Sequence, residues 1–202
     1  MKKIKPIIVI CIDGLDPEYL NILEIPNIAN LIGNGFYKLG ECIWPSVTNV
    51  NNVSILTGEY PKKHGICSNY QYVKKTGEEI YMESSEFILH PTIFTMAKNK
   101  GLETLLATSK DKLRTLLGKG ATNIISSEQT HPWLNNILGP PPPIYSLEVN
   151  AWTIKAAMHA IKKFNPAFTY ITTTDYAMHK YPPQSNKSKI HLQLIDSAIG
   201  EL

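Results

Sequence analysis

The segment Pro6-Ile7-Ile8-Val9-Ile10-Cys11-Ile12-Asp13-Gly14 decides the fold class. Its run of β-branched residues has the length of a strand, and unbroken apolar runs of this kind are typical of parallel strands that are buried on both faces. We therefore expect a first strand over residues 6–12, which ends at Asp13 and belongs to a buried sheet.

Patterns typical of helices and strands alternate along the rest of the chain. A helical pattern that includes Leu23 starts at Pro17, is broken at Pro26 and ends at Gly33 and Gly35. Further helices are expected from Thr48 to Gly58 and over residues 91–100, 111–117, 147–163 and 187–202, and strands over 36–43, 103–108, 122–126 and 167–174. This alternation predicts an α/β fold with a mostly parallel sheet and helices on both faces.

The chain has the size and composition of one domain. It has 202 residues, of which 43% are hydrophobic, which is enough for a sizeable core. Residues 60–90 are polar, turn-rich and aromatic, and this composition predicts an insertion or a short hairpin over the sheet. We therefore expect a single catalytic-type domain over residues 1–202.

Charge and hydropathy restrict the partners. The formal net charge of +3 favours small anionic ligands and indicates neither nucleic acid nor a membrane surface as a partner. The basic residues 1–5 and the apolar run after them look like a signal peptide, but the run is short and ends at an acid. With three free, structural cysteines expected at Cys11, Cys42 and Cys67, we predict a cytoplasmic protein in a reducing compartment.

Carboxylates follow two of the expected strands. Asp13 follows the first strand, and Asp175 follows the strand over 167–174, with His179 four residues later on the same side of a helical turn. Carboxylate oxygens and imidazole nitrogens are ligands of divalent metals such as zinc. The alternative for Asp175 and His179 is a capping Asp followed by a surface His.

Thr48 lies at the expected start of a helix, where free N–H groups and the helix dipole favour phosphate or phosphonate oxygens. It is either an ordinary helix cap or a nucleophile that a metal activates. Lys110 and Lys112 flank Asp111 after the strand over 103–108. They either clamp a carboxylate or form a solvated helix start.

In combination, these residues resemble a known superfamily. Trp44-Pro-Ser-Val-Thr-Asn-Val-Asn-Asn-Val-Ser-Ile-Leu-Thr-Gly-Glu-Tyr-Pro-Lys-Lys-His-Gly-Ile66 resembles the nucleophile segment of the phosphodiesterase and phosphonate-hydrolase branch of the alkaline phosphatase superfamily. Asp13-Gly14 looks like its first metal-binding Asp, and Asp175-Tyr-Ala-Met-His179 looks like its metal-binding Asp and His.

Two further segments resemble the phosphonoacetate hydrolase family within that branch. They are Gly65-Ile-Cys-Ser-Asn69-Tyr70 and Thr108-Ser-Lys110-Asp-Lys112-Leu-Arg114. The resemblance implies that Asn69 helps to hold the phosphonate and that Lys110 and Lys112 bind the carboxylate of the substrate.

The resemblance also implies an activity and its cofactors. Asp13, Thr48, Asp175 and His179 are implied to bind two divalent metal ions, which are zinc or, alternatively, manganese or iron. Thr48 is the implied nucleophile in hydrolysis of the C–P bond of phosphonoacetate to acetate and phosphate. The alternatives are a nucleotide pyrophosphatase/phosphodiesterase and a non-catalytic remnant.

The family places further metal ligands, an Asp-His pair and another His, in its C-terminal half. After His179 this sequence has only Asp196, which Ser197 follows, and Glu201 as carboxylate side chains. We therefore expect an alkaline phosphatase-like fold that is incomplete at its C-terminus and has an uncovered sheet edge. The partner expected from this is a second copy or a complementing C-terminal chain.

Overall fold

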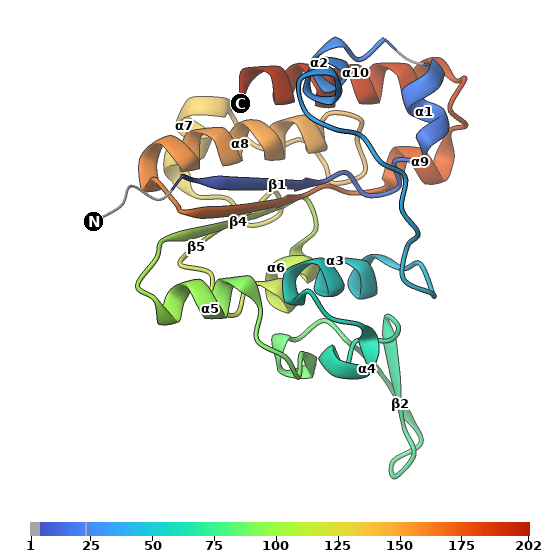
Figure 1. Cartoon of the computed structure of the whole chain (residues 1–202), viewed down its shortest axis with the longest axis vertical. Coiled ribbons are helices and arrows are strands. Elements are labelled where there is room, and N and C mark those ends of the chain that lie inside the picture. Colours follow the sequence, from blue (N-terminus) through green and yellow to red (C-terminus); the bar gives the residue numbers. More distant parts are fainter. Residues whose placement is uncertain (1–4, 23) are drawn as a thin grey trace.

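The computed structural model describes residues 5–22 and 24–202 (Figure 1). Leu23, which the helical pattern includes, and residues 1–4 of the basic N-terminal segment lie outside these described residues.

A parallel sheet forms the centre of the fold. Its strands lie in the order β1 (Ile7–Cys11), β6 (Phe168–Thr172), β4 (Thr104–Thr108) and β5 (Asn123–Ser126). Each neighbouring pair is parallel, and both Cys11 and Thr108 lie opposite Thr172. The carboxyl ends of three strands therefore meet at one end of the sheet, and the predicted α/β fold with a mostly parallel sheet is confirmed.

Helices cover both faces of this sheet, as predicted (Figure 1). One face carries α2 (Pro26–Asn34), α7 (Pro132–Leu138), α8 (Val149–Phe164) and α10 (Asn186–Glu201). The other face carries α3 (Thr48–Thr57), α5 (Ile93–Asn99) and α6 (Asp111–Leu117).

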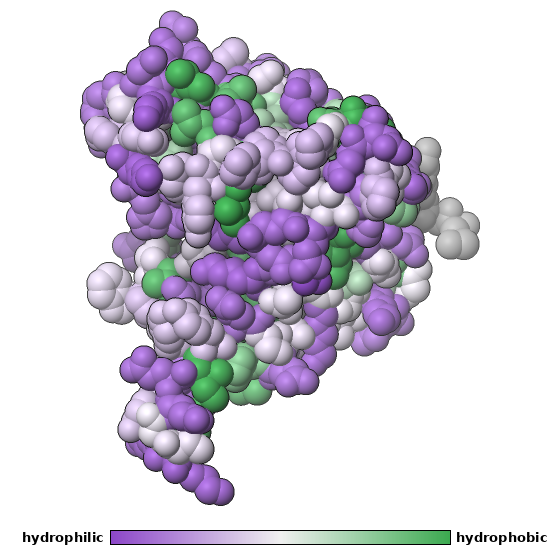
Figure 2. All heavy atoms as spheres, turned by 180° about the vertical axis from the view of Figure 1, so that it is seen from behind, coloured by the Kyte–Doolittle hydropathy of each residue, from purple (hydrophilic) through white to green (hydrophobic). Residues whose placement is uncertain are grey.

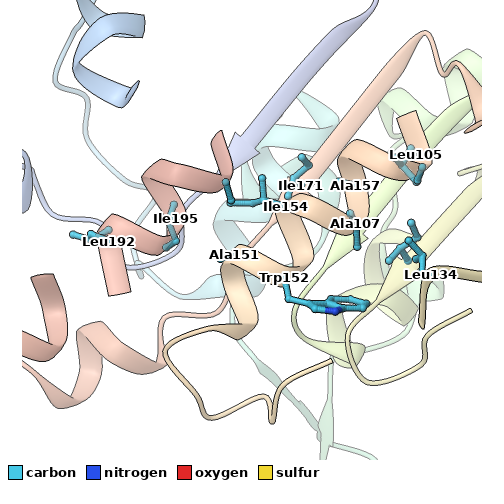
Figure 3. Close-up of a cluster of buried hydrophobic side chains, with 14 of the residues drawn as sticks. Leu105, Ala107, Leu134, Ala151, Trp152, Ile154, Ala157, Ile171, Leu192 and Ile195 are labelled. Atoms are coloured by element: carbon cyan, nitrogen blue, oxygen red, sulfur yellow. The ribbon is translucent and has the colours of Figure 1, made fainter. Parts of the chain in front are cut away.

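Alternating side chains of the central strands produce two cores. Leu105 and Ala107 of β4 pack with Ile154 of α8 in one core, where the side chains lie between the sheet and the helices (Figure 3). Leu106, between them, points to the opposite core with Leu116 of α6. Both cores contain fully buried side chains, so the central strands are held from both faces.

Strand β1 differs from our expectation. We predicted a strand buried on both faces, but Ile7 and Ile8 are 59% and 40% exposed. Among the described strands β1 pairs only with β6, so it forms an edge of the sheet. The apolar run predicted the strand correctly but not its position, because hydropathy does not encode the order of strands.

Two other elements also differ from the prediction. Residues 36–43 contain no strand, and Phe36 is 89% exposed, because no described strand lies beside this segment to pair with it. Helix α7 was not predicted, although Pro132 occupies its first turn and Gly139 follows its end with a φ of 75°. These are the usual residues for the start and the end of a helix.

The remaining elements are short. The segment over 60–90 contains α4 (Pro61–His64), an antiparallel hairpin of β2 (Tyr70–Val73) and β3 (Glu78–Tyr81), and a 3₁₀ turn, η1 (Ser85–Phe87). The hairpin projects from the body of the molecule (Figure 1). Helices α1 (Pro17–Ile22) and α9 (Tyr176–Lys180) follow β1 and β6.

Asp196 holds two helices together. Its buried carboxylate on α10 accepts hydrogen bonds from the N–H groups of Asn27 and Ile28 and from the side-chain amide of Asn27. It therefore caps the first turn of α2 from another helix, and this contact assigns the carboxylate a structural role.

The face shown in Figure 2 is mostly hydrophilic, with hydrophobic residues in separate patches. None of the helices in the described residues combines the length and the apolar character that crossing a membrane requires. Cys11, Cys42 and Cys67 are free, and Cys11 is half-buried while the other two are exposed.

Candidate active site

Five of the predicted site residues form one continuous line of polar contacts. Thr48 Oγ1 donates to Asp13 Oδ2 at 2.9 Å. Lys110 Nζ lies 3.3 Å from the same oxygen of Asp13 and 2.5 Å from Oδ1 of Asp175. His179 Nε2 lies 2.9 Å from the other oxygen of Asp175. Residues 166 positions apart in the chain are thus brought together at the carboxyl ends of the strands.

The backbone at the end of β1 positions Asp13. Its N–H donates to Thr173 Oγ1 at 3.0 Å, which links the end of β1 to the end of β6. Gly14 then turns the chain with a φ of 79°. A Cβ at this position would lie 3.1 Å from the Cβ atoms of Asp175 and Met178, so glycine lets the two metal-ligand candidates approach each other.

Thr48 is the first residue of α3, and Val47 precedes it as a cap residue without a capping side chain. The N–H groups of the first turn are therefore not satisfied by a capping side chain, and such groups at a helix start favour anions. Asn52 Nδ2 donates to the Thr48 carbonyl at 2.9 Å, and its Oδ1 accepts from Tyr170 of β6 at 2.8 Å. The nucleophile candidate is thus held against the sheet.

Lys110 and Asp175 both lie where a strand leads into a helix. Lys110 occupies the N-cap position of α6 after β4, and Asp175 that of α9 after β6, and neither side chain makes a capping hydrogen bond. Their side chains are only 13% and 20% exposed, whereas His179 is 77% exposed. The Lys110–Asp175 pair is therefore shielded from water, and His179 lies at the solvent side of the site.

The two carboxylates have different electrostatic environments. Burial raises the pKa of Asp13, because the attraction of Lys110 does not compensate fully for lost hydration. Burial also opposes ionisation of Asp175, but the hydrogen bond and the charge of Lys110 outweigh it and lower the pKa of Asp175. Asp13 is more deeply buried and is repelled by Asp175, whereas Lys110 lies closer to Asp175, so the two pKa values shift in opposite directions.

The other two predicted site residues do not join the line of contacts. The Asn69 side-chain oxygen is buried without a hydrogen-bond partner among the described residues. Met82 connects Asn69 to α3, because its N–H donates to the Asn69 carbonyl and its carbonyl accepts from Asn49 Nδ2. Lys112 is half-buried in the first turn of α6 and forms no ion pair with the residues that the structure describes.

The donor atoms fit part of a divalent metal centre. Asp13 and Thr48 offer one pair of oxygens, and Asp175 with His179 offers an oxygen and a nitrogen, which suit zinc. Catalytic zinc usually has three protein ligands. Within residues 5–22 and 24–202 no three or more His, Cys, Asp or Glu side chains gather in an arrangement that would hold a metal ion. Each pair therefore needs further ligands.

Sequence reasoning missed the residues whose hydrogen bonds position the backbone of the site. Asn52, Tyr170 and Thr173 fix the backbone of Thr48 and Asp13, and Asn150 bonds to the backbone just before Asp175. The amphipathic pattern of α8 predicts a buried face that includes Asn150, and a polar residue on such a face is the signal that would have found it.

The family comparison matches nearly all of the chain. The profile of the family described as "Type I phosphodiesterase / nucleotide pyrophosphatase" matches residues 7–202. Among curated proteins, the venom phosphodiesterase of Naja atra is 27% identical over 209 residues, which cover 98% of this chain and 23% of that protein. Human ectonucleotide pyrophosphatase/phosphodiesterase family member 1 is 27% identical over 98% of this chain and 21% of its own.

A solved structure is more similar. The crystal structure of phosphonoacetate hydrolase from Sinorhizobium meliloti 1021 in complex with phosphonoformate superposes with a TM-score of 0.90 and 35% identity, over 97% of this chain and 52% of that chain. Murine ectonucleotide pyrophosphatase/phosphodiesterase 5 superposes with a TM-score of 0.69 and 16% identity, which shows a shared fold. The resemblance to the alkaline phosphatase superfamily is confirmed. This chain spans about half the length of the first protein and less than a quarter of the venom enzyme.

Proposed function

Because this chain belongs to the type I phosphodiesterase / nucleotide pyrophosphatase family, we propose that it supplies the nucleophile and four metal ligands of a hydrolase that cleaves the C–P bond of phosphonoacetate. The observation that carries the proposal is the contact between Thr48 Oγ1 and Asp13 Oδ2. Lys110 contacts both Asp13 and Asp175, and Asp175 contacts His179. The higher similarity to phosphonoacetate hydrolase than to the nucleotide enzymes supports this substrate.

Asp13 and Thr48 are proposed to hold one divalent ion, and Asp175 and His179 the other. A bound zinc ion supplies positive charge that makes a hydroxyl more acidic and stabilises a phosphoryl group in the transition state. The first turn of α3 holds the phosphonate oxygens through its N–H groups, and Asn69 adds its side-chain amide. Asp13 accepts the hydrogen bond of Thr48 and so orients Oγ1 toward phosphorus.

Thr48 Oγ1 gives its proton to solvent water and forms the new bond to phosphorus while the C–P bond breaks. The electron pair stays on the departing carbon and is delocalised over the carboxylate of the substrate, and a proton from water then gives acetate. Lys110 and Lys112 are proposed to stabilise this growing negative charge. Water hydrolyses the phosphothreonine and releases phosphate.

This chain offers only two ligands to each metal ion, so further coordination positions remain for residues of a partner. We propose that a second copy or a complementing polypeptide fills them by docking along β1. The exposed Ile7 and Ile8 support this place, as does the edge of β1 that no other described strand pairs with and that leads directly to Asp13. Native mass spectrometry of the purified protein, with and without zinc, measures its assembly state.

The second candidate is a nucleotide phosphodiesterase, which the family profile and the curated relatives favour. The test offers phosphonoacetate and a nitrophenyl phosphodiester, with zinc, to the wild-type protein, to Thr48→Ala and to Thr57→Ala. Thr57 lies at the far end of the same helix and bonds to the Val53 carbonyl, so it is a matched control.

Phosphate release from phosphonoacetate that only Thr48→Ala abolishes supports the proposal. Release that Thr48→Ala leaves unchanged contradicts it, and turnover of the diester alone favours the second candidate. If neither substrate is turned over and zinc binds weakly, the chain is a non-catalytic remnant.

A further inference from the structure

Asn150 uses its whole amide in hydrogen bonds. It is fully buried on α8. Its Oδ1 accepts from the Thr174 N–H at 2.8 Å and from Ser109 Oγ at 2.9 Å. Its Nδ2 donates to the Thr174 carbonyl at 2.7 Å and lies 3.3 Å from His191 Nε2. Two acceptor positions and two donor hydrogens are the full capacity of an asparagine side chain.

These contacts fix the orientation of the amide and the tautomer of His191. A backbone N–H only donates and a backbone carbonyl only accepts, so Thr174 distinguishes Oδ1 from Nδ2 of Asn150. Nε2 of His191 must then accept, and its Nδ1–H donates to the Leu147 carbonyl at 2.8 Å. Burial lowers the pKa of His191, which agrees with a neutral ring.

The amide bonds to the residues immediately before the two partners of the central ion pair, to the backbone of Thr174 and to the side-chain hydroxyl of Ser109. Thr174 precedes Asp175, and Ser109 precedes Lys110. The paired region of β4 and β6 ends at Thr108 and Thr172, so these residues lie just beyond the sheet. Asn150 therefore joins the two strand ends at the place where regular strand pairing stops.

We propose that Asn150, supported by His191, is a positioning residue that sets Asp175 and Lys110 at their mutual distance and so shapes half of the metal site. The metal part of this inference rests on the proposed function. A merely structural Asn150 would contribute to folding stability without affecting the geometry at Asp175. Outer-shell contacts that orient metal ligands change metal affinity by about 10- to 100-fold when they are removed.

The test compares Asn150→Ala with Ile154→Ala. Ile154 lies one helical turn further along α8, is fully buried and belongs to the core between α8 and the sheet (Figure 3), and its aliphatic side chain makes no hydrogen bond to the network. Both variants are expected to unfold at lower temperature. Zinc is titrated calorimetrically into each protein, and Asn150→Ala is expected to bind it at least tenfold more weakly than Ile154→Ala. Equal affinities of the two variants would overturn the inference.

Crystal structures of the two variants give a second readout that needs no metal. Ile154→Ala is expected to keep Lys110 Nζ within ion-pair distance of Asp175, and Asn150→Ala to lose this contact. An intact pair in Asn150→Ala would refute the positioning role even if the wild-type protein bound no zinc. Absence of zinc binding by the wild type would instead count against the proposed function.

Discussion

Lys110 Nζ lies 2.5 Å from Asp175 Oδ1 and 3.3 Å from Asp13 Oδ2, so one ammonium group bridges the carboxylates that follow β6 and β1. Asp13 and Asp175 are the metal-ligand candidates of the two halves of the site. The charge of Lys110 therefore balances two carboxylates that would otherwise repel each other in a partly buried space.

Replacement of Lys110 by Met is expected to destabilise the metal-free protein by about 1–3 kcal/mol at pH 7, because Asp175 keeps its burial and loses its partner. The folded pKa of Asp175 lies below its unfolded value, so this stabilisation is present above the unfolded pKa and disappears as pH falls through the folded pKa. The difference in thermal stability between the wild type and Lys110→Met should therefore become smaller at acidic pH. Lys155→Met, which breaks the exposed pair with Glu201, is the control and should cost less than about 1 kcal/mol. Equal losses in both variants would contradict the account.

Asp13→Asn is expected to raise the unfolding temperature of the metal-free protein at neutral pH. The folded pKa of Asp13 lies above its unfolded value, so its ionised form opposes folding at neutral pH. The gain should vanish as pH falls below the unfolded pKa, where the carboxyl is protonated in both states. The same variant should lose the stabilisation that zinc gives to the wild type. A lower unfolding temperature at pH 7 would show that the ionised form is favoured after all.

Gly14→Ala is expected to lose stability through backbone strain and through crowding of Asp175. Gly58 provides the control, because its φ of 67° is also left-handed but open space surrounds its Cβ position. Backbone strain alone should lower the free energy of unfolding of each variant, measured by urea denaturation, by about 1 kcal/mol. Gly14→Ala should lower the free energy of unfolding by more than this and should also weaken zinc binding. Gly58→Ala should leave zinc binding unchanged. Identical behaviour of the two would exclude close packing at Gly14 as a determinant of the site.

Asp196→Ala is expected to lower the free energy of unfolding by about 0.5–2 kcal/mol, because the first turn of α2 loses its cap. Zinc affinity should stay within twofold of the wild-type value, since the carboxylate serves α2 and lies outside the line of site contacts. Calorimetric titration and urea denaturation of the same preparation measure both quantities. A large loss of zinc affinity without a loss of stability would assign Asp196 to the metal site instead.

Much of the fold was predictable because its signals are local. The apolar runs of β1 and β6, followed by Asp13 and Asp175, indicated parallel strands whose ends meet. The helix that starts at Thr48 was predicted from its local pattern, whereas the nucleophile role of Thr48 was implied only by the family resemblance and stays a prediction. Local patterns were sufficient to place Asp13 and Asp175 at neighbouring strand ends, because strand ends in a parallel sheet lie side by side.

The remaining features depend on contacts between distant segments. The edge position of β1 follows from strand order, and the exposed apolar residues at 36–43 form no strand because they have no neighbour to pair with. The bonds of Asn150 to Thr174 and Ser109 span 24 and 41 positions. The pattern of α8 marks Asn150 as a polar residue on a buried face, but it does not encode the partners of its amide, which only the folded structure shows.

The central claim is that Thr48 attacks phosphorus, and the most direct measurement is acid quenching during turnover of phosphonoacetate with zinc, followed by mass spectrometry of the peptide that contains Thr48. We predict a phosphoryl group on Thr48 in the wild-type protein and in Thr57→Ala, and none in Thr48→Ala. Release of phosphate without a phosphoryl group on Thr48, or with the group on another residue, would contradict the claim.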